Sequence, residues 1–218
     1  MYPKLLKTIE LLKKQEIAED RKAILAPLID FIQKRLEEQK AASLNFICTH
    51  NSRRSHLAQV WAQVASFYYD VPNLTCYSGG TEETALFPKV VDTLQEQGLF
   101  IDKISSTENP VYAIRYDESR HPIIGFSKRY DSSFNPTRGF AAIMTCSEAD
   151  GGCPFIGGAD LRIPITFKDP KVSDGTSEQT EIYKERSLQI GSEMFYVFSQ
   201  IENKTDLNKR NAIKIKIS

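Results

Sequence analysis

A short apolar run at residues 44–47 leads directly into a loop with one cysteine, and the loop leads into an amphipathic stretch. The loop has Cys-x5-Arg-Ser spacing, with the residues Cys48-Thr49-His50-Asn51-Ser52-Arg53-Arg54-Ser55. A strand, a loop and a helix in this order form a site for anions, because unpaired backbone N–H groups and the positive end of the helix dipole converge there. The order therefore favours a fold in which strands feed helices across a sheet.

The alternation of strand and helix patterns continues along the chain. Hydrophobic periodicity predicts strands at 44–48, 74–78, 140–145 and 161–165, and helices at 54–69, 86–97 and 177–202. Thr176 and Gln179 have the spacing of a capping box at the start of the last helix. We expect a three-layer α/β fold with a mostly parallel, about four-stranded sheet flanked by helices.

Two segments fall outside this alternation. Residues 1–42 predict a helical extension of two helices, separated by a bend near Pro27 or by a loop around Glu19 and Asp20, and residues 43–218 form the main domain. Residues 108–138 predict an inserted hairpin, which is either an extra edge pair of strands or a lid over the active site. The alternating tail at 213–217 is either an edge strand or a frayed end.

Composition limits the partners of the chain. It has 218 residues, 41% of them hydrophobic, and a formal net charge of zero, so no general attraction to nucleic acid or membrane is expected. Lysines interrupt the first residues where a signal peptide needs an apolar core, and no stretch has transmembrane length. We therefore expect a cytoplasmic protein with free thiols.

The loop after the first strand is a candidate oxyanion site with Cys48 as its nucleophile. A planar Arg54 fork can hold two oxygens of a tetrahedral anion, and the same field favours the reactive thiolate of Cys48, with a further hydrogen bond from Ser55. Arg53 is expected to point to solvent. The alternative is a buried strand cysteine beside a capped helix. The predicted oxyanion-binding residues are Thr49, His50, Asn51, Ser52, Arg53, Arg54 and Ser55.

Two further cysteines, Cys146 and Cys153, share one loop with two glycines, Gly151 and Gly152. Thiols so close in a reducing compartment indicate redox exchange or a metal site. A zinc site needs four ligands, and no Cys-x2-Cys pair or histidine lies near, so we expect no metal and interpret the pair as a redox relay. Cys76 on the second predicted strand is expected to be a buried core thiol.

Together these motifs resemble the low-molecular-weight protein tyrosine phosphatases and the thioredoxin-coupled arsenate reductases that share their fold. Besides the Cys48 loop, the resemblance rests on Tyr77-Ser78-Gly79-Gly80 and on Asp169-Pro170 after the last predicted strand. It covers most of residues 43–202. The chain departs from the family at His50, where glycine is usual, at Arg53, where cysteine is usual, and at Gln59, where a glutamate can help to bind potassium.

The resemblance implies an enzyme and a role for each residue. Cys48 would attack arsenate held by Arg54, Asp169 would act as the general acid, and Cys146 and Cys153 would pass the disulfide outward to a thioredoxin-like dithiol, with no other cofactor. The Cys-x6-Cys pair resembles the arsenate reductase branch, so we expect arsenate reduction with residual phosphatase activity. One alternative is a tyrosine or small-ester phosphatase with a redox-switch cysteine pair, and another is an oxyanion-binding module without turnover.

Overall fold

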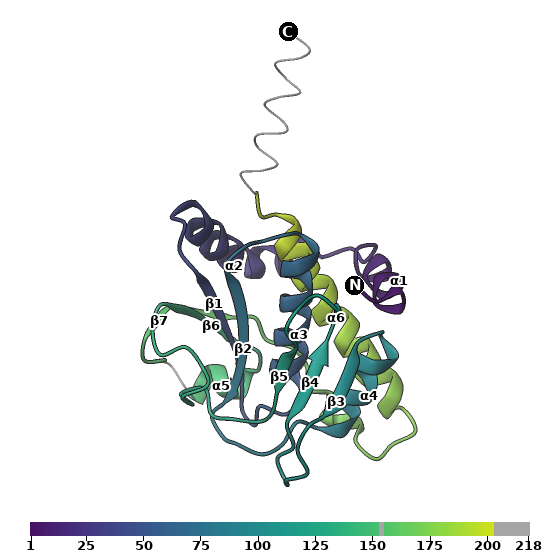
Figure 1. Ribbon diagram of the computed structural model, residues 1–218. Helices are drawn as coiled ribbons and strands as arrows, with labels where there is room; N and C mark the ends of the chain where they lie inside the picture. The colour runs from purple at the N-terminus through teal and green to yellow at the C-terminus, as the bar shows by residue number, and fades with distance from the viewer. Residues whose placement is uncertain (153–154, 203–218) are drawn as a thin grey trace, which may run out of the picture.

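The computed structural model describes residues 1–152 and 155–202. At its centre lies a four-stranded parallel sheet, ordered β2-β1-β6-β7 (Figure 1). The strands are β1 (Ala42–Cys48), β2 (Leu74–Gly80), β6 (Phe140–Met144) and β7 (Ala159–Pro164). The predicted parallel sheet is confirmed. Because β1 and β6 are parallel neighbours, with Ile47 opposite Met144, the residues that follow them emerge at the same edge of the sheet.

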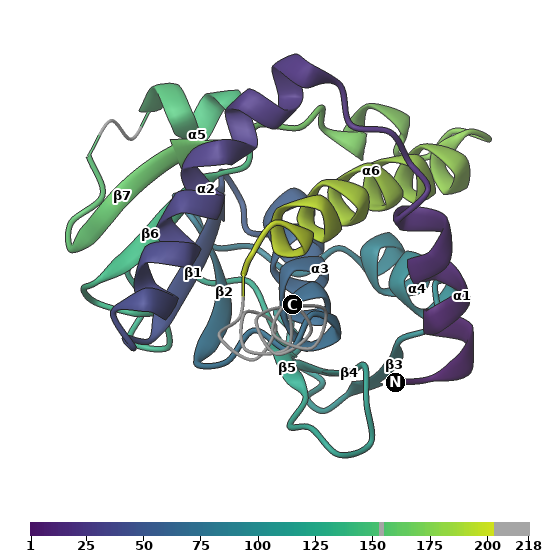
Figure 2. The same cartoon turned by 90° about the horizontal axis from the view of Figure 1, so that it is seen from above.

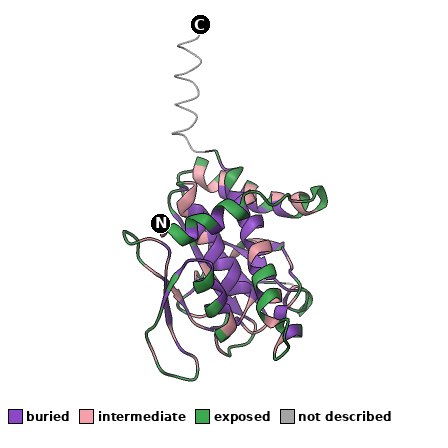
Figure 3. Cartoon of the chain, turned by 90° about the vertical axis from the view of Figure 1, so that its right-hand side faces the viewer, coloured by how far each residue is buried: buried purple, intermediate pink, exposed green. Residues whose placement is uncertain are grey.

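Alternating side chains of β1 enter two separate hydrophobic clusters. Leu44 and Phe46 belong to the larger cluster, and Ile47 belongs to the smaller one together with Ala149 of α5 (Ser147–Gly152). The larger cluster also contains residues of α3 (Arg54–Tyr68), α4 (Pro88–Glu96) and α6 (Gln179–Ser199). The buried stretches of the chain concentrate at the centre of the molecule, and the exposed ones lie at its periphery (Figure 3). The predicted three-layer α/β architecture is confirmed.

The inserted hairpin forms a sheet of its own. The strands β4 (Tyr112–Arg115) and β5 (Ile123–Gly125) pair in antiparallel fashion as predicted, and β3 (Phe100–Lys103), which was not predicted, pairs with β4. The hairpin is therefore not an edge pair of the main sheet. After β5 the chain returns to the main sheet, where Arg129 forms a bridge with Gly80 at the end of β2.

The N-terminal segment contains the two predicted helices, α1 (Pro3–Leu12) and α2 (Glu19–Glu37). The break lies before Glu19, and Pro27 lies inside α2. Leu5 of α1 and Leu28 of α2 are fully buried in the larger hydrophobic cluster, together with residues of the main domain. Both helices also contact α6 (Figure 2). The division of the chain at residue 42 stays a prediction.

Two local predictions for the last helix and the cysteine loop were wrong. The N-cap of α6 is Glu178, and the side chain of Gln179 donates to Asp174 instead of closing a capping box. Residues 147–152 are helical rather than a loop, because the N–H of Ala149 turns back to donate to the Cys146 sulfur. Cys153 and the tail at 213–217 lie outside the described residues.

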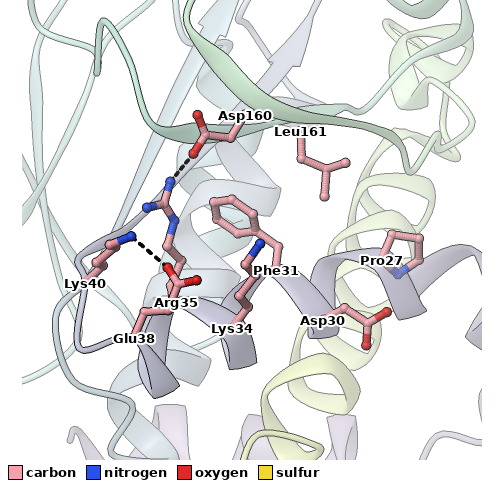
Figure 4. Close-up of a pocket in the computed structure, with 9 residues that line it drawn as sticks. All are labelled: Pro27, Asp30, Phe31, Lys34, Arg35, Glu38, Lys40, Asp160 and Leu161. Atoms are coloured by element: carbon pink, nitrogen blue, oxygen red, sulfur yellow. Dashed lines mark hydrogen bonds and ion pairs between the residues drawn. The ribbon is translucent and has the colours of Figure 1, made fainter.

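A groove of about 490 Å³ lies between α2 and β7, away from the cysteines. Phe31 and Leu161 form its apolar part, Arg35 pairs with Asp160 across it, and Lys40 pairs with Glu38 at 3.0 Å (Figure 4). None of the predicted site residues lines it. Among the described residues, no helix combines the length and the apolar character needed to cross a bilayer.

Candidate active site

Cys48 is the last residue of β1, and its thiol is buried beside the first turn of α3. Its sulfur lies 3.1 Å from the Ser55 hydroxyl oxygen, and the Asn51 amide donates to that same oxygen at 2.9 Å. Because the Ser55 oxygen accepts from Asn51, its own proton is free to donate to the sulfur. A donor at this place stabilises a thiolate, which is the form of cysteine that attacks electrophiles.

The carbonyl groups of the loop point outward. The Cys48 carbonyl accepts from the Thr81 N–H at 3.1 Å, the Thr49 carbonyl from the Glu82 N–H at 2.8 Å, and the Ser52 carbonyl from the Phe87 N–H at 3.1 Å. The His50 carbonyl accepts from the hydroxyls of Thr84 and Ser127. A loop whose carbonyl oxygens are engaged on the outside can turn the N–H groups of residues 49–54 inward, as a cradle for an anion requires.

Asn51 holds the loop in its conformation. Its φ angle of 44° lies in the left-handed region, which asparagine tolerates better than most residues. Its side-chain oxygen accepts from the Lys128 N–H at 2.9 Å, and its amide group reaches Ser55. These contacts fix the conformation of the loop, and the segment after β5 provides the anchor.

Arg54 is the first residue of α3, and its side chain is buried at the mouth of the loop. One guanidinium nitrogen donates to the Phe167 carbonyl at 3.1 Å, and the other donates to the Asp169 carboxylate at 2.6 Å. Glu148 of α5 lies 3.7 Å from the first nitrogen. Both terminal nitrogens are thus tied to the loop after β7, which fixes the plane of the guanidinium in one orientation, as a bidentate anion ligand needs.

Asp169 lies on the loop after β7 and caps the short 3₁₀ helix η1 (Pro170–Ser173). One carboxylate oxygen accepts from the Lys171 N–H at 3.0 Å, and the other accepts from Arg54. With 30% of its side chain exposed, it remains accessible to a bound molecule. The structure therefore brings Asp169 to the loop that carries Cys48 and Arg54, although it lies 115 residues after Arg54 in the sequence.

Cys146 follows β6 and is fully buried in the same small cluster as Cys48. Its sulfur lies 3.5 Å from the Thr49 hydroxyl and accepts from the Ala149 N–H at 3.3 Å. Burial raises the pKa of Cys146, although both hydrogen bonds act to lower it. The Cys146 thiol thus lies against the nucleophile loop, in the same buried cluster as Cys48.

The side chains of His50 and Arg53 do not face the anion cradle. The His50 ring is 42% exposed and lies 3.4 Å from the Glu82 carboxylate. The Arg53 side chain was expected to point to solvent, but only 12% of it is exposed, and it bonds to Tyr183 and Asp174. The expectation was wrong because these partners lie more than one hundred residues away, where no local pattern reveals them.

Two residues near the site, Lys128 and His56, gave no sequence signal. Lys128 is almost fully buried, and burial lowers its pKa to about 8. His56 on α3 is fully buried, and burial together with the charge of Lys128 lowers its pKa to about 3. Gln59 donates to the Cys76 carbonyl at 3.0 Å, and Cys76 is a buried core thiol as predicted.

Comparisons with known proteins give a structural similarity alone. No protein-family model and no curated protein sequence matches the chain. Similar solved structures include a low-molecular-weight phosphotyrosine phosphatase from Vibrio cholerae O395, at 16% identity over 73% of this chain and 95% of that one, with a TM-score of 0.47. An arsenate reductase in the phosphate-binding state is similar at 16% identity over 74% and 99%, with a TM-score of 0.45. A low-molecular-weight protein tyrosine phosphatase from T. tengcongensis is similar at 14% identity over 74% and 100%, with a TM-score of 0.49. What this site can do is decided by its own side chains.

Proposed function

We propose that this chain is an arsenate reductase that forms a covalent adduct on Cys48 and passes its oxidation to Cys146. The observation that carries the proposal is the position of Cys146, which shares a buried cluster with Cys48 and contacts Thr49 of the nucleophile loop. A second thiol beside an anion cradle is not needed for simple hydrolysis. It is needed for the two-electron reduction of a bound anion, because two thiols supply these electrons when they form a disulfide.

The first step is nucleophilic substitution at arsenic. The Cys48 thiolate attacks arsenate held by the loop N–H groups and by Arg54, and a sulfur–arsenic bond replaces an arsenic–oxygen bond. Asp169 acts as the general acid and gives a proton to the departing oxygen, which leaves as water. The positive groups of the cradle stabilise the negative charge on the remaining oxygens.

The second step reduces the arsenic. The Cys146 thiolate attacks the Cys48 sulfur, the sulfur–sulfur bond forms, and the electron pair of the sulfur–arsenic bond stays with arsenic. Arsenic goes from the +5 to the +3 state and leaves as arsenite, while two thiols become one disulfide. Cys153 then attacks Cys146, and a thioredoxin-like dithiol in the cytoplasm reduces the resulting disulfide.

The test compares two reactions in two cysteine variants. In Cys146→Ser, thioredoxin-coupled arsenite formation should stop, while hydrolysis of a chromogenic phosphate ester should continue, because hydrolysis ends with attack of water on the Cys48 adduct. The control Cys76→Ala removes a core thiol that lies outside the site and should keep both reactions. Wild-type protein without arsenate turnover, or arsenate turnover that persists in Cys146→Ser, would contradict the reductase proposal.

A phosphatase acting on phosphotyrosine or a small phosphate ester is the second candidate. The observation that favours it is that the nucleophile, the arginine and the acid already form a complete set, with Arg54 joined to Asp169 at 2.6 Å. In that case Cys146 would act as a redox switch, by forming a disulfide with Cys48 under oxidation. Efficient ester hydrolysis without arsenate turnover, unaffected by Cys146→Ser under reducing conditions, would put this candidate first.

A further inference from the structure

Arg53 belongs to the nucleophile loop, yet its side chain turns away from the anion cradle toward α6. Its Nε donates to the Tyr183 hydroxyl at 2.6 Å, and one terminal nitrogen donates to the Asp174 carboxylate at 2.6 Å. The guanidinium carbon lies 4.1 Å from the centre of the Phe87 ring. A planar cation that makes all three contacts at once has one orientation, which a flexible lysine ammonium cannot reproduce.

The partners of Arg53 are themselves joined to one another. The Tyr183 hydroxyl donates to Asp174 at 2.6 Å, and the Phe87 ring stacks on the Tyr183 ring at 5.8 Å between centroids. Burial acts to raise the pKa of Asp174, but hydrogen bonds from Tyr183 and Gln179 and the charge of Arg53 lower it overall. Asp174 is therefore held as an anion in a partly buried network.

Asp174 ends the same short segment that begins with Asp169. Within it, the Asp174 N–H donates to the Lys171 carbonyl at 3.0 Å, and the Ser173 hydroxyl donates to the Pro170 carbonyl at 2.8 Å. The segment is thus a tight, internally bonded turn. The two consecutive arginines of the nucleophile loop hold its two ends, Arg54 at Asp169 and Arg53 at Asp174.

We propose that Arg53 is a positioning residue that fixes the Asp169 carboxyl relative to Cys48 by clamping the far end of residues 169–174. The inference rests on the proposed function, in which Asp169 protonates the leaving group. A proton donor must be held within hydrogen-bond reach of the leaving oxygen. If the clamp is released, the turn shifts and protonation is lost, while Cys48 and the N–H cradle keep their places.

The test uses two esters that differ in their need for an acid. Phenyl phosphate has a poor leaving group that must be protonated, and p-nitrophenyl phosphate has a good one that needs little help. In Arg53→Lys, kcat for phenyl phosphate should fall about tenfold or more, and kcat for p-nitrophenyl phosphate should fall less than about threefold, because general acid catalysis contributes at least about a hundredfold where it is needed. KM should stay nearly constant, because Arg53 does not face the anion.

Two further variants separate positioning from a general structural effect. Arg138→Lys, at an exposed arginine outside the site, should leave both esters unchanged. Tyr183→Phe removes only the hydroxyl that joins Arg53 to Asp174, and it should show the same selective loss at smaller size. If Arg53→Lys does not fold by circular dichroism, Tyr183→Phe alone decides the question.

Equal losses for the two esters, or no loss for either, would overturn the positioning role of Arg53 while leaving the proposed function intact. A wild-type protein that hydrolyses neither ester and reduces no arsenate would overturn both. A selective loss for phenyl phosphate in Arg53→Lys, with unchanged Arg138→Lys, supports the inference.

Discussion

Arg54 is the residue on which anion binding depends most. Each of its two terminal nitrogens donates one N–H, to the Phe167 carbonyl and to the Asp169 carboxylate, so its plane is fixed before an anion arrives. Preorganised donors contribute more to catalysis than mobile ones, because they need no rearrangement as charge develops. Lysine keeps the charge but loses the fork.

We therefore expect Arg54→Lys to lower kcat/KM for p-nitrophenyl phosphate about a hundredfold or more, in line with the loss of one transition-state donor. Steady-state kinetics checks this, with Arg138→Lys as the matched control. A loss smaller than about fivefold would mean that Arg54 does not hold the anion.

The protonation of Cys146 sets the pH dependence of the reduction step. Burial raises the pKa of Cys146, so its thiol is mostly protonated near pH 7 and the thiolate fraction grows as the pH rises toward and beyond 9. Single-turnover arsenite release should accelerate over this range, by at most about tenfold for each pH unit.

Ester hydrolysis serves as the internal reference for this effect, since it does not use Cys146. Rapid quenching with arsenite detection at pH 7, 8 and 9 measures the release. A release rate that follows the pH profile of ester hydrolysis would show that attack by Cys146 is not the limiting step.

At the scale of elements, the end of β2 supports the nucleophile loop through a close approach of backbones. A Cβ at Gly80 would lie 2.6 Å from the Thr49 carbonyl oxygen and 2.7 Å from the Asn51 nitrogen. Real Cβ contacts are not this short, so an alanine there must displace the loop.

Gly80→Ala should lower the free energy of unfolding by about 1–3 kcal/mol and abolish most ester hydrolysis. Gly151→Ala is the control, because a Cβ at Gly151 meets no atom within 4 Å and alanine favours the helix. Urea denaturation and ester kinetics measure the two effects. Normal hydrolysis in Gly80→Ala would contradict the close approach.

Local patterns predicted the strands and helices that build the site. They failed where contacts between residues far apart in the sequence determine the direction of a side chain. The apolar strand before Cys48 and the amphipathic helix after Arg54 follow from periodicity alone. The direction of Arg53 does not, because Asp174 lies 121 residues away, and neither does the anchor of Asn51 on Lys128, 77 residues away. The strand β3 was missed because it is four residues long with three exposed side chains, which leaves no alternating pattern.

At the scale of the whole molecule, the N-terminal helices share the main hydrophobic core. Leu28 of α2 is fully buried among residues of that core, and Ile24 on the same helix is 41% exposed. A helix that covers core surface contributes to the stability of the domain it covers.

Leu28→Ala should therefore lower the free energy of unfolding of the whole chain by about 2–5 kcal/mol, in one cooperative transition. Ile24→Ala should change it by less than about 1 kcal/mol. Urea denaturation followed by circular dichroism and by tryptophan fluorescence of Trp61 measures both variants. Two separate transitions, with Trp61 unaffected by Leu28→Ala, would show that the helices fold apart from the core.

In the proposed reaction, Cys48 carries the anion and Cys146 removes the oxidation from it. The most direct test is a single turnover of the Cys153→Ser variant with arsenate and no external reductant, followed by alkylation and mass spectrometry. About one arsenite per protein should form, together with a disulfide between Cys48 and Cys146, and Cys76 should remain free. Arsenite release with Cys146 alkylated, or a protein with all thiols alkylated and no arsenite formed, would contradict it.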